Sequence, residues 1–242
     1  MVHGDSIANL DVWQVPLTTS RLDWWTRWRG VLAADEVGRA ERLLLPSARR
    51  QFVLSHVALR HVLGGYLGMS PGSLLLARDP RGKPQVRRSA GASVHFNLAH
   101  TGDLALIAVS PDAPVGVDVE QVRPWPRDLF VTAGSFFSDR ERSLLEQVPP
   151  HLLPQAFARC WTRKESMVKA MGTGLTSLVL AGFDVGVWPI ESECGPRWHD
   201  GRSSAWTLSD VGTVTGCVAS VASAGSAHQV RCRFVAVEEL AG

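Results

Sequence analysis

The pentapeptide at 116–120, Gly-Val-Asp-Val-Glu, alternates apolar and acidic side chains and so constrains how this part of the chain can fold. Alternate side chains of an extended strand share one face. We therefore predict a strand in which Val117 and Val119 point to a core, while Asp118 and Glu120 point the other way. Two carboxylates this close repel each other unless a proton or a cation intervenes. Mg²⁺ prefers such hard oxygen ligands.

The glycine that opens this motif, Gly116, is expected to let the strand approach another backbone or a ligand closely. An edge strand with two solvated acids would show the same five residues. The pentapeptide alone therefore leaves a metal site and a solvated surface as open interpretations.

A second charged stretch, residues 161–175, has the pattern of a helix that ends in glycines. Glu165 and Lys169 are four residues apart and so share a helix face, with Lys164 beside them. Glycines at 172 and 174 would stop the helix and leave open backbone next to the charged face. A Glu–Lys pair at this spacing is most often a surface ion pair. Together, however, the two stretches offer three carboxylates for a divalent cation and two ammonium groups for phosphate. This combination predicts phosphoryl-transfer chemistry.

Charge is distributed unevenly along the 242 residues, which are enough for one large domain or two small ones. Residues 1–90 hold 13 Lys+Arg against 7 Asp+Glu, which leaves 12 against 16 for the rest of the chain. A basic first part and an acidic second part suit an anionic ligand held between them, although uneven surface charge without a ligand is common. The short Pro-Asp-Ala-Pro break at 111–114 predicts two halves, 1–113 and 114–242.

Hydrophobic periodicity and turn residues predict a mixed chain of helices and strands. The predicted strands are 11–17, 93–98, 104–110, 115–120, 206–209, 214–222 and 229–237. The predicted helices lie within 32–67, interrupted at Pro46 with Ser47 as a possible N-cap, near 127–148 and at 151–172. A turn is predicted at 79–84.

Three further features concern the compartment. Residues 1–6 lack the basic and apolar segments of a secretory signal, and no apolar run approaches the roughly 20 residues that cross a bilayer. The four cysteines lack metal-site spacing and are expected to be buried free thiols. Arginines are not interleaved with aromatic residues, so we expect no nucleic-acid binding. We predict a cytoplasmic protein that binds neither a membrane nor nucleic acid.

The motifs, taken in order, resemble those of the 4′-phosphopantetheinyl transferases of the larger, surfactin-synthetase-activating type. That family carries a Gly-(Val/Ile)-Asp-(Val/Ile)-Glu strand, matched at 116–120, and a Trp-x-x-Lys-Glu-(Ser/Ala)-x-x-Lys-x-x-Gly-x-Gly-Leu helix, matched at 161–175. Residues 82–84 match its Gly-Lys-Pro turn. Residues 96–102 resemble its Phe-Asn-(Leu/Ile)-Ser-His-Ser-Gly segment, and residues 136–138 resemble its Phe-Phe-Ser.

The resemblance implies an α+β fold with two similar α/β halves related by a pseudo-twofold axis. Each half would be a mainly antiparallel sheet packed with a long helix, and the ligand would lie in the cleft between them. Residues 1–113 would bind coenzyme A, while residues 114–242 would bind magnesium and carry out catalysis. Similar proteins act as monomers.

The resemblance also implies an activity of the holo-[acyl-carrier-protein] synthase type. Such an enzyme transfers 4′-phosphopantetheine from coenzyme A to a serine of an apo acyl or peptidyl carrier protein and releases adenosine 3′,5′-bisphosphate. The residues leave open whether the carriers serve polyketide, non-ribosomal peptide, fatty acid or lysine biosynthesis. By resemblance, Mg²⁺ (or Mn²⁺) binds Asp118, Glu120 and Glu165, and Glu165 and Lys169 are catalytic.

The coenzyme A contacts that the resemblance implies lie on both halves. They are Arg49, Arg50, Gly82, Lys83, Pro84, Ala99, His100, Thr101, Lys164 and Lys169. Ala99 stands where the family usually has serine, which removes one hydroxyl. A coenzyme A or carrier-protein binding module without turnover stays open as an alternative. So does another Mg-dependent phosphoryl transferase, although the chain has no Gly-x-x-x-x-Gly-Lys-Ser/Thr loop.

Overall fold

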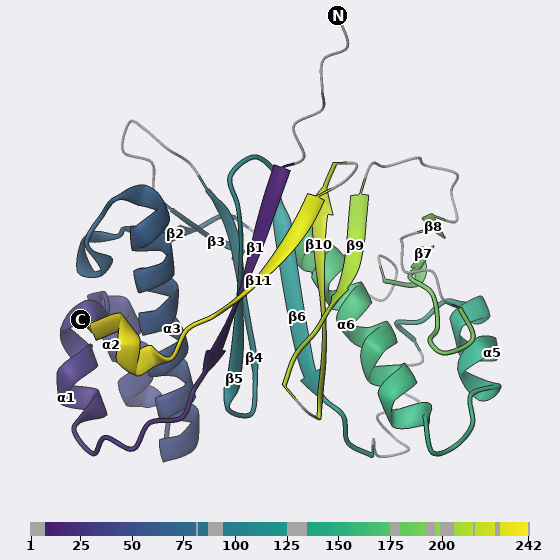
Figure 1. Ribbon diagram of the computed structural model, residues 1–242, viewed down its shortest axis with the longest axis horizontal. Coiled ribbons are helices and arrows are strands. Elements are labelled where there is room, and N and C mark those ends of the chain that lie inside the picture. Colours follow the sequence, from purple (N-terminus) through teal and green to yellow (C-terminus); the bar gives the residue numbers. More distant parts are fainter. Residues whose placement is uncertain are drawn as a thin grey trace, which may run out of the picture.

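The chain forms four layers, in which two sheets lie face to face between helices α3 and α6 (Figure 1). The computed structural model describes residues 8–80, 82–86, 94–124, 135–174, 180–191, 197–198, 206–214, 216–225 and 228–241. One sheet has the strand order β11-β1-β5-β4 and the other β6-β10-β9, with two short hairpins beside them. The prediction of a mixed α+β fold is therefore confirmed.

The strands are β1 (Ala8–Pro16), β2 (Leu76–Arg78), β3 (Pro84–Val86), β4 (His95–Thr101), β5 (Leu104–Ser110), β6 (Val115–Gln121), β7 (Phe183–Asp184), β8 (Arg197–Trp198), β9 (Trp206–Val211), β10 (Cys217–Ala224) and β11 (His228–Phe234). The helices are α1 (Trp24–Trp28), α2 (Ala34–Arg42), α3 (Pro46–Leu67), α5 (Asp139–Glu146) and α6 (Leu153–Met171), with 3-10 turns η1 (Arg29–Val31), η2 (Pro71–Ser73) and η3 (Val237–Ala241).

Strand β11 lies in the sheet of the first half, where it pairs in parallel with β1. Valines 235 and 237, which follow it, pack into the same core as α3. The predicted boundary after residue 113 falls between β5 and β6, but the chain from 228 onward returns to the first half. The other two pairings of that sheet, β1 with β5 and β4 with β5, are antiparallel.

Helix α3 begins two residues earlier than a cap at Ser47 predicts, because Pro46 occupies its first turn with the fixed φ that suits this position. Leu45 is the N-cap, so the prediction that Ser47 caps the helix is wrong. Helix α5 has a capping box, in which Ser138 and Glu141 each bind the other's backbone N–H. The earlier part of the predicted helix 127–148 lies partly outside the described residues, since 125–134 are not among them.

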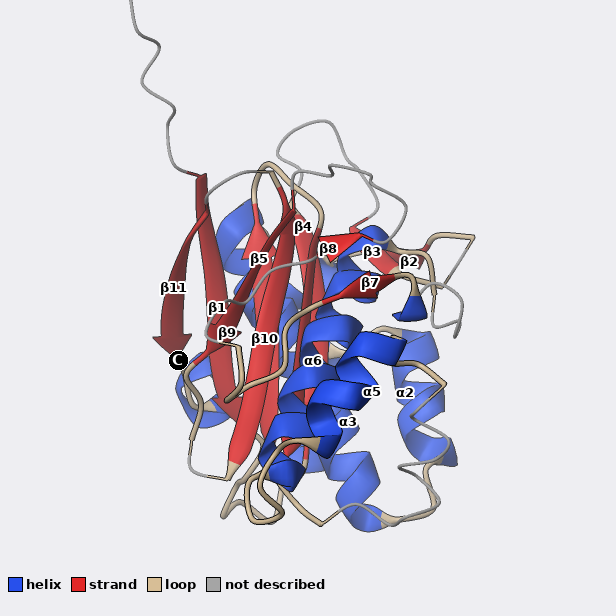
Figure 2. Cartoon of the chain, turned by 90° about the vertical axis from the view of Figure 1, so that its right-hand side faces the viewer, coloured by secondary structure: helices blue, strands red, loops and turns tan. Residues whose placement is uncertain are grey.

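The core between the two sheets explains which way the side chains of the 116–120 motif point. Val117 and Val119 are buried there, opposite residues such as Val12 of β1 and Leu106 of β5. Asp118 must then lie on the other face of β6, toward α6, as the alternation predicts. Figure 2 views the molecule from this side, where α5 and α6 cover the sheet β6-β10-β9.

Two other predictions concern the cysteines and the membrane. Cys160 is a buried free thiol as predicted, Cys217 is half-buried, and Cys232 is exposed, so the prediction is wrong for Cys232 because β11 turns it outward at the sheet edge. Cys194 lies outside the described residues. Within the described part of the chain, no helix is both long and apolar enough to span a membrane.

Candidate active site

Strand β6 lies directly against helix α6 because it has no side chain at position 116. A Cβ atom on Gly116 would lie 2.2 Å from the carbonyl oxygen of Ser166 and 2.3 Å from the backbone nitrogen of Ala170, distances that real atoms do not reach. The prediction that Gly116 permits a close backbone approach is confirmed, and the partner is α6. This contact brings the acidic face of β6 onto the charged face of α6.

An ammonium group lies between two carboxylates at this contact. Lys169 Nζ is 2.6 Å from Asp118 Oδ1 and 3.7 Å from Glu165 Oε2. Both carboxylate side chains are about 8% exposed and the lysine side chain is 29% exposed. The second oxygen of Asp118, Oδ2, is buried and has no hydrogen-bond partner. A buried carboxylate oxygen without a donor is costly and favours a cation or a proton.

The crowding of acids is visible in their pKa values. Burial, together with the nearby Asp118 and Glu165 carboxylates, raises the pKa of Glu120 to about 7. Burial raises the pKa of Asp118 and of Glu165 as well, even though Lys169 opposes the rise. Burial would lower the pKa of Lys169, but these carboxylates outweigh it and raise the pKa. The site therefore favours additional positive charge.

Three adjoining cavities connect this charged contact with the first half of the chain. The nearest, about 270 Å³, is lined by Glu165 and Lys169 and reaches Gly82 and Pro84. A second, about 310 Å³, shares Pro84 and Asn97 with it and leads to His100. A third, about 730 Å³, shares Lys83 and Pro84 and lies beside the end of α6. The hollow space thus runs from the carboxylates along β3 and β4.

The comparisons with known proteins decide the family. The model described as "4'-phosphopantetheinyl transferase, N-terminal" matches residues 18–112, and that of the "4'-phosphopantetheinyl transferase superfamily" matches residues 114–222. The 4′-phosphopantetheinyl transferase HetI of Nostoc sp. is 36% identical over 219 residues, which are 90% of this chain and 89% of HetI. The chain belongs to the 4′-phosphopantetheinyl transferase superfamily.

Other relatives agree with this assignment. The 4′-phosphopantetheinyl transferase psf-1 of Bacillus pumilus is 34% identical over 137 residues, 57% of this chain and 56% of psf-1. The L-aminoadipate-semialdehyde dehydrogenase-phosphopantetheinyl transferase of Xenopus laevis is 24% identical over 201 residues, 77% of this chain and 66% of that protein. The resemblance is confirmed, and the chain is an enzyme that transfers phosphopantetheine to carrier proteins. Coenzyme A is the substrate of this family.

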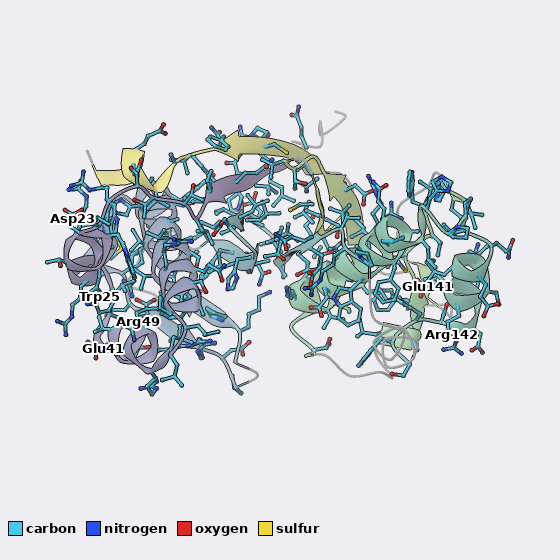
Figure 3. The ribbon with its side chains drawn as sticks, turned by 90° about the horizontal axis from the view of Figure 1, so that it is seen from below. Asp23, Trp25, Glu41, Arg49, Glu141 and Arg142 are labelled. Carbon is cyan, nitrogen blue, oxygen red and sulfur yellow. The ribbon has the colours of Figure 1, made fainter. Side chains whose placement is uncertain are left out.

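The two lysines of the helical motif have different places in this transferase. Lys169 lies at the carboxylates, whereas Lys164 is fully buried on the far side of α6, 2.7 Å from Glu141 of α5. Figure 3 shows Glu141 between these two helices. The Lys164 ammonium also donates hydrogen bonds to the carbonyl oxygens of Leu180 and Phe183. Its three donors are thus occupied inside the protein, which does not fit the expected pyrophosphate contact.

Lys83 connects the two halves of the transferase. Its ammonium donates to the carbonyl oxygens of Lys169, at 2.6 Å, and of Val115, at 3.1 Å. It therefore binds the C-terminal end of α6 from the hairpin β2–β3, where a cation interacts favourably with the helix dipole. Burial lowers the pKa of Lys83. Its turn is held by Asp79, whose carboxylate accepts the backbone N–H of Lys83, and by Gly82 at φ 86°.

The two arginines expected to contact coenzyme A have protein partners. Arg49 donates to the carbonyl oxygens of Ala40, Glu41 and Leu43 and so holds the end of α2, as Figure 3 shows beside Glu41. Arg50 is half-exposed and lies 3.4 Å from Asp103. Arg49 therefore has a structural role that the sequence did not reveal. The side chain of Arg50 lies near the turn between β4 and β5.

The segment around β4 places one expected residue at the cavity and one in the core. His100 lines the second cavity, and burial with the nearby Lys169 and Arg39 lowers the pKa of His100. Ala99 is buried between the sheets, so the alanine in place of the family's serine packs apolar surface. Thr101, half-buried, ends β4.

Sequence reasoning missed two residues of this region. Arg39 of α2 lines the cavity of His100 and lies over the Phe52 ring at 5.0 Å. No motif contains it; the packing of α2 onto α3 brings it there. Asn97 does lie in a motif, and its side-chain oxygen accepts the backbone N–H of Val117 at 3.0 Å. This bond fixes β4 against β6 across the two sheets.

Proposed function

We propose that this transferase moves 4′-phosphopantetheine from coenzyme A to a serine hydroxyl of apo acyl or peptidyl carrier proteins and releases adenosine 3′,5′-bisphosphate, with Mg²⁺ or Mn²⁺ as cofactor. One observation carries the proposal: the buried Asp118 Oδ2 lacks a hydrogen-bond partner beside Lys169 and Glu165. A buried carboxylate oxygen left without a donor beside two further acids is where a bound cation would supply the missing partner.

The residues fit a divalent cation in chemistry. Asp118, Glu120 and Glu165 offer hard carboxylate oxygens, which Mg²⁺ and Mn²⁺ prefer. No group of three His, Cys, Asp or Glu side chains stands ready to hold a metal ion among the described residues. The Lys169 ammonium lies between two of the proposed ligands, so the carboxylates and the lysine must rearrange for metal binding. When bound, the cation would neutralise charge on pyrophosphate oxygens.

The chain's own residues supply the rest of the chemistry. The serine oxygen forms a bond to the β-phosphorus, the bond from that phosphorus to the bridging oxygen breaks, and adenosine 3′,5′-bisphosphate leaves. Glu165, which lines the cavity beside Lys169, accepts the serine proton directly or through water. Lys169 binds the pyrophosphate oxygens and stabilises the leaving phosphate. Positioning and charge neutralisation contribute most in such transfers.

Coenzyme A would lie along the adjoining cavities, in a cleft between two similar halves. We propose that residues 1–113 hold the nucleotide, with His100, Thr101, Pro84 and Arg50 beside it, and that residues from 114 onward hold the metal. Arg39 joins this set, because it lines the cavity of His100. Lys164 is left out, because its donors bind Glu141 and backbone carbonyls. A monomer located in the cytoplasm is part of the same proposal.

A direct assay tests the proposal. The protein is mixed with an apo carrier protein, coenzyme A and Mg²⁺, and the carrier is weighed by mass spectrometry. We expect a mass gain of one phosphopantetheine group. Asp118→Ala and Glu165→Gln should each abolish the gain while circular dichroism shows an unchanged fold. Glu146→Gln, an exposed change on α5, is the matched control and should transfer normally. Near-normal transfer by Asp118→Ala or Glu165→Gln would contradict the metal-site assignment.

A further inference from the structure

Lys169 occupies the place at which a cation would meet two of the three acids. Its ammonium is 2.6 Å from Asp118 Oδ1 and 3.7 Å from Glu165 Oε2, and both acids are nearly buried. An ammonium and a divalent cation cannot share one pair of carboxylates at such distances, because like charges repel strongly in a buried site. Binding of one therefore opposes binding of the other.

The lysine has room to leave. The cavity of about 270 Å³ next to Lys169 is bounded by the glycines at 82, 172 and 174, which have no side chains to fill it. A lysine side chain is a point charge on a flexible four-carbon stem. Its backbone, in contrast, is fixed, since the Lys83 ammonium binds the Lys169 carbonyl oxygen at 2.6 Å. Only the side chain needs to turn from the acids into the cavity.

We propose that Lys169 is a resident counter-cation, which competes with the divalent metal for Asp118 and Glu165 until the pyrophosphate of coenzyme A draws the ammonium away. The inference rests on the proposed function, which supplies the metal and coenzyme A as ligands. Its consequence is positive coupling: coenzyme A strengthens metal binding, and the metal strengthens coenzyme A binding by the same factor. The acids then bind metal mainly in the protein that already holds substrate.

The first test measures Mn²⁺ binding by electron paramagnetic resonance, with and without coenzyme A and with no carrier protein. Lys169→Met should bind Mn²⁺ about tenfold more tightly than wild type when coenzyme A is absent, and coenzyme A should increase Mn²⁺ affinity less than in wild type. Lys169→Arg keeps the charge and should bind Mn²⁺ weakly, like wild type. Arg159→Met removes a positive charge elsewhere on α6 and controls for a general charge effect.

The outcomes separate this inference from the proposed function. If Asp118→Ala leaves Mn²⁺ binding unchanged, the metal-site assignment itself is wrong. If Mn²⁺ binding requires Asp118 but Lys169→Met, while folded, binds Mn²⁺ no more tightly than wild type, only the competition is overturned. An equal gain in Arg159→Met would also overturn it.

A second test observes the lysine itself. The chain has only three lysines, at 83, 164 and 169, so ¹³Cε labelling gives three resolvable signals. Adding Mg²⁺ and coenzyme A should change the ¹³Cε chemical shift of Lys169. The metal concentration at the midpoint of this change should equal the midpoint of metal binding. Lys164, fully buried against Glu141, serves as the internal control and should not move. A Lys169 signal that does not respond would overturn the inference.

Discussion

Helix α6 carries two lysine–carboxylate pairs, one fully and one partly buried, and they are built in opposite ways. In the pair of Lys164 with Glu141, both side chains are 0% exposed and lie 2.7 Å apart. The remaining donors of the lysine bind backbone carbonyls, and the carboxylate accepts the N–H groups of Ser138 and Val185. In the pair of Lys169 with Asp118, one carboxylate oxygen is buried without a partner.

The difference shows how function can be separated from stability in a buried ion pair. A pair whose donors and acceptors are all satisfied holds α5 against α6 and offers nothing to a ligand. A pair with an unsatisfied oxygen, a third acid nearby and a cavity beside it can exchange its cation. Both lysines belong to the same sequence motif, so only their surroundings distinguish them.

Breaking the pair of Lys164 with Glu141 should have the largest effect on stability. Lys164→Met leaves Glu141 buried without its cation, and removal of one partner of a buried pair costs about 3–5 kcal/mol of unfolding free energy. Urea denaturation followed by circular dichroism measures this loss. The fraction that remains folded should keep its transfer turnover. A turnover loss as large as that of Lys169→Met would return Lys164 to the active site.

Breaking the pair of Lys169 with Asp118 should instead lower turnover strongly and stability less. Lys169→Met should lower turnover about 100- to 1000-fold, because a donor aimed at developing phosphate charge is removed. Its unfolding free energy should fall less than that of Lys164→Met, because the Lys169 side chain is 29% exposed and its pairing is screened by water, whereas both side chains of the Lys164 pair are 0% exposed. Single-turnover kinetics and urea denaturation give the two numbers. A stability loss like that of Lys164→Met would remove the contrast between the pairs.

The pair of Lys169 with Asp118 also depends on the close approach of β6 to α6 at Gly116. Gly116→Ala places a methyl group within 2.2 Å of the Ser166 carbonyl oxygen, which forces β6 from α6 and separates the acids. We expect a loss of about 1–3 kcal/mol in unfolding free energy, together with weaker Mn²⁺ binding. Gly212→Ala, where no atom lies within 4 Å of the added Cβ, is the control and should change neither quantity. Unaltered Mn²⁺ binding in Gly116→Ala would show that the contact does not set the site.

An intermediate case is Asp11, which is buried but binds half-exposed arginines. Burial would raise the pKa of Asp11, but hydrogen bonds from Tyr66, Arg231 and Arg233 outweigh it and lower the pKa. The stabilisation is thus complete above 3.8, the ordinary pKa of Asp, and is lost as the pH falls through the lower folded value. Asp11→Asn should cost about 1–2 kcal/mol at neutral pH and less in acid. Urea denaturation at several pH values measures it; a pH-independent difference would contradict the lowered pKa.

The parts of the site that lie within one strand or one helix could be predicted from the sequence. The alternation of 116–120 predicted which way Asp118 points, and a spacing of four placed Glu165 and Lys169 on one helix face. The glycine at 116 was correctly expected at a close approach. These inferences needed only the periods of strands and helices.

The rest depended on contacts between segments far apart in the sequence. Neither the helix that meets Lys164 nor the carbonyls that bind Arg49 can be read from their neighbours in the chain. Lys83 and Arg39 are similar cases, because each takes its place from the packing of another element. The resemblance named Arg49, Lys83 and Lys164 but not Arg39, and it could not say which cation faces a ligand and which faces the protein.

The return of β11 to the first sheet has a consequence for synthesis. The bond from Arg231 to Asp11 joins residues 220 positions apart, and β11 covers one edge of β1. A chain made from its N-terminus therefore holds β1 with an open edge until the residues of β11 emerge. The sheet that contains β1, although its first strand is translated early, is therefore completed only after β6, β9 and β10 of the other sheet have been translated. A ribosome-stalled chain that ends before residue 228 should thus be open to protease along β1.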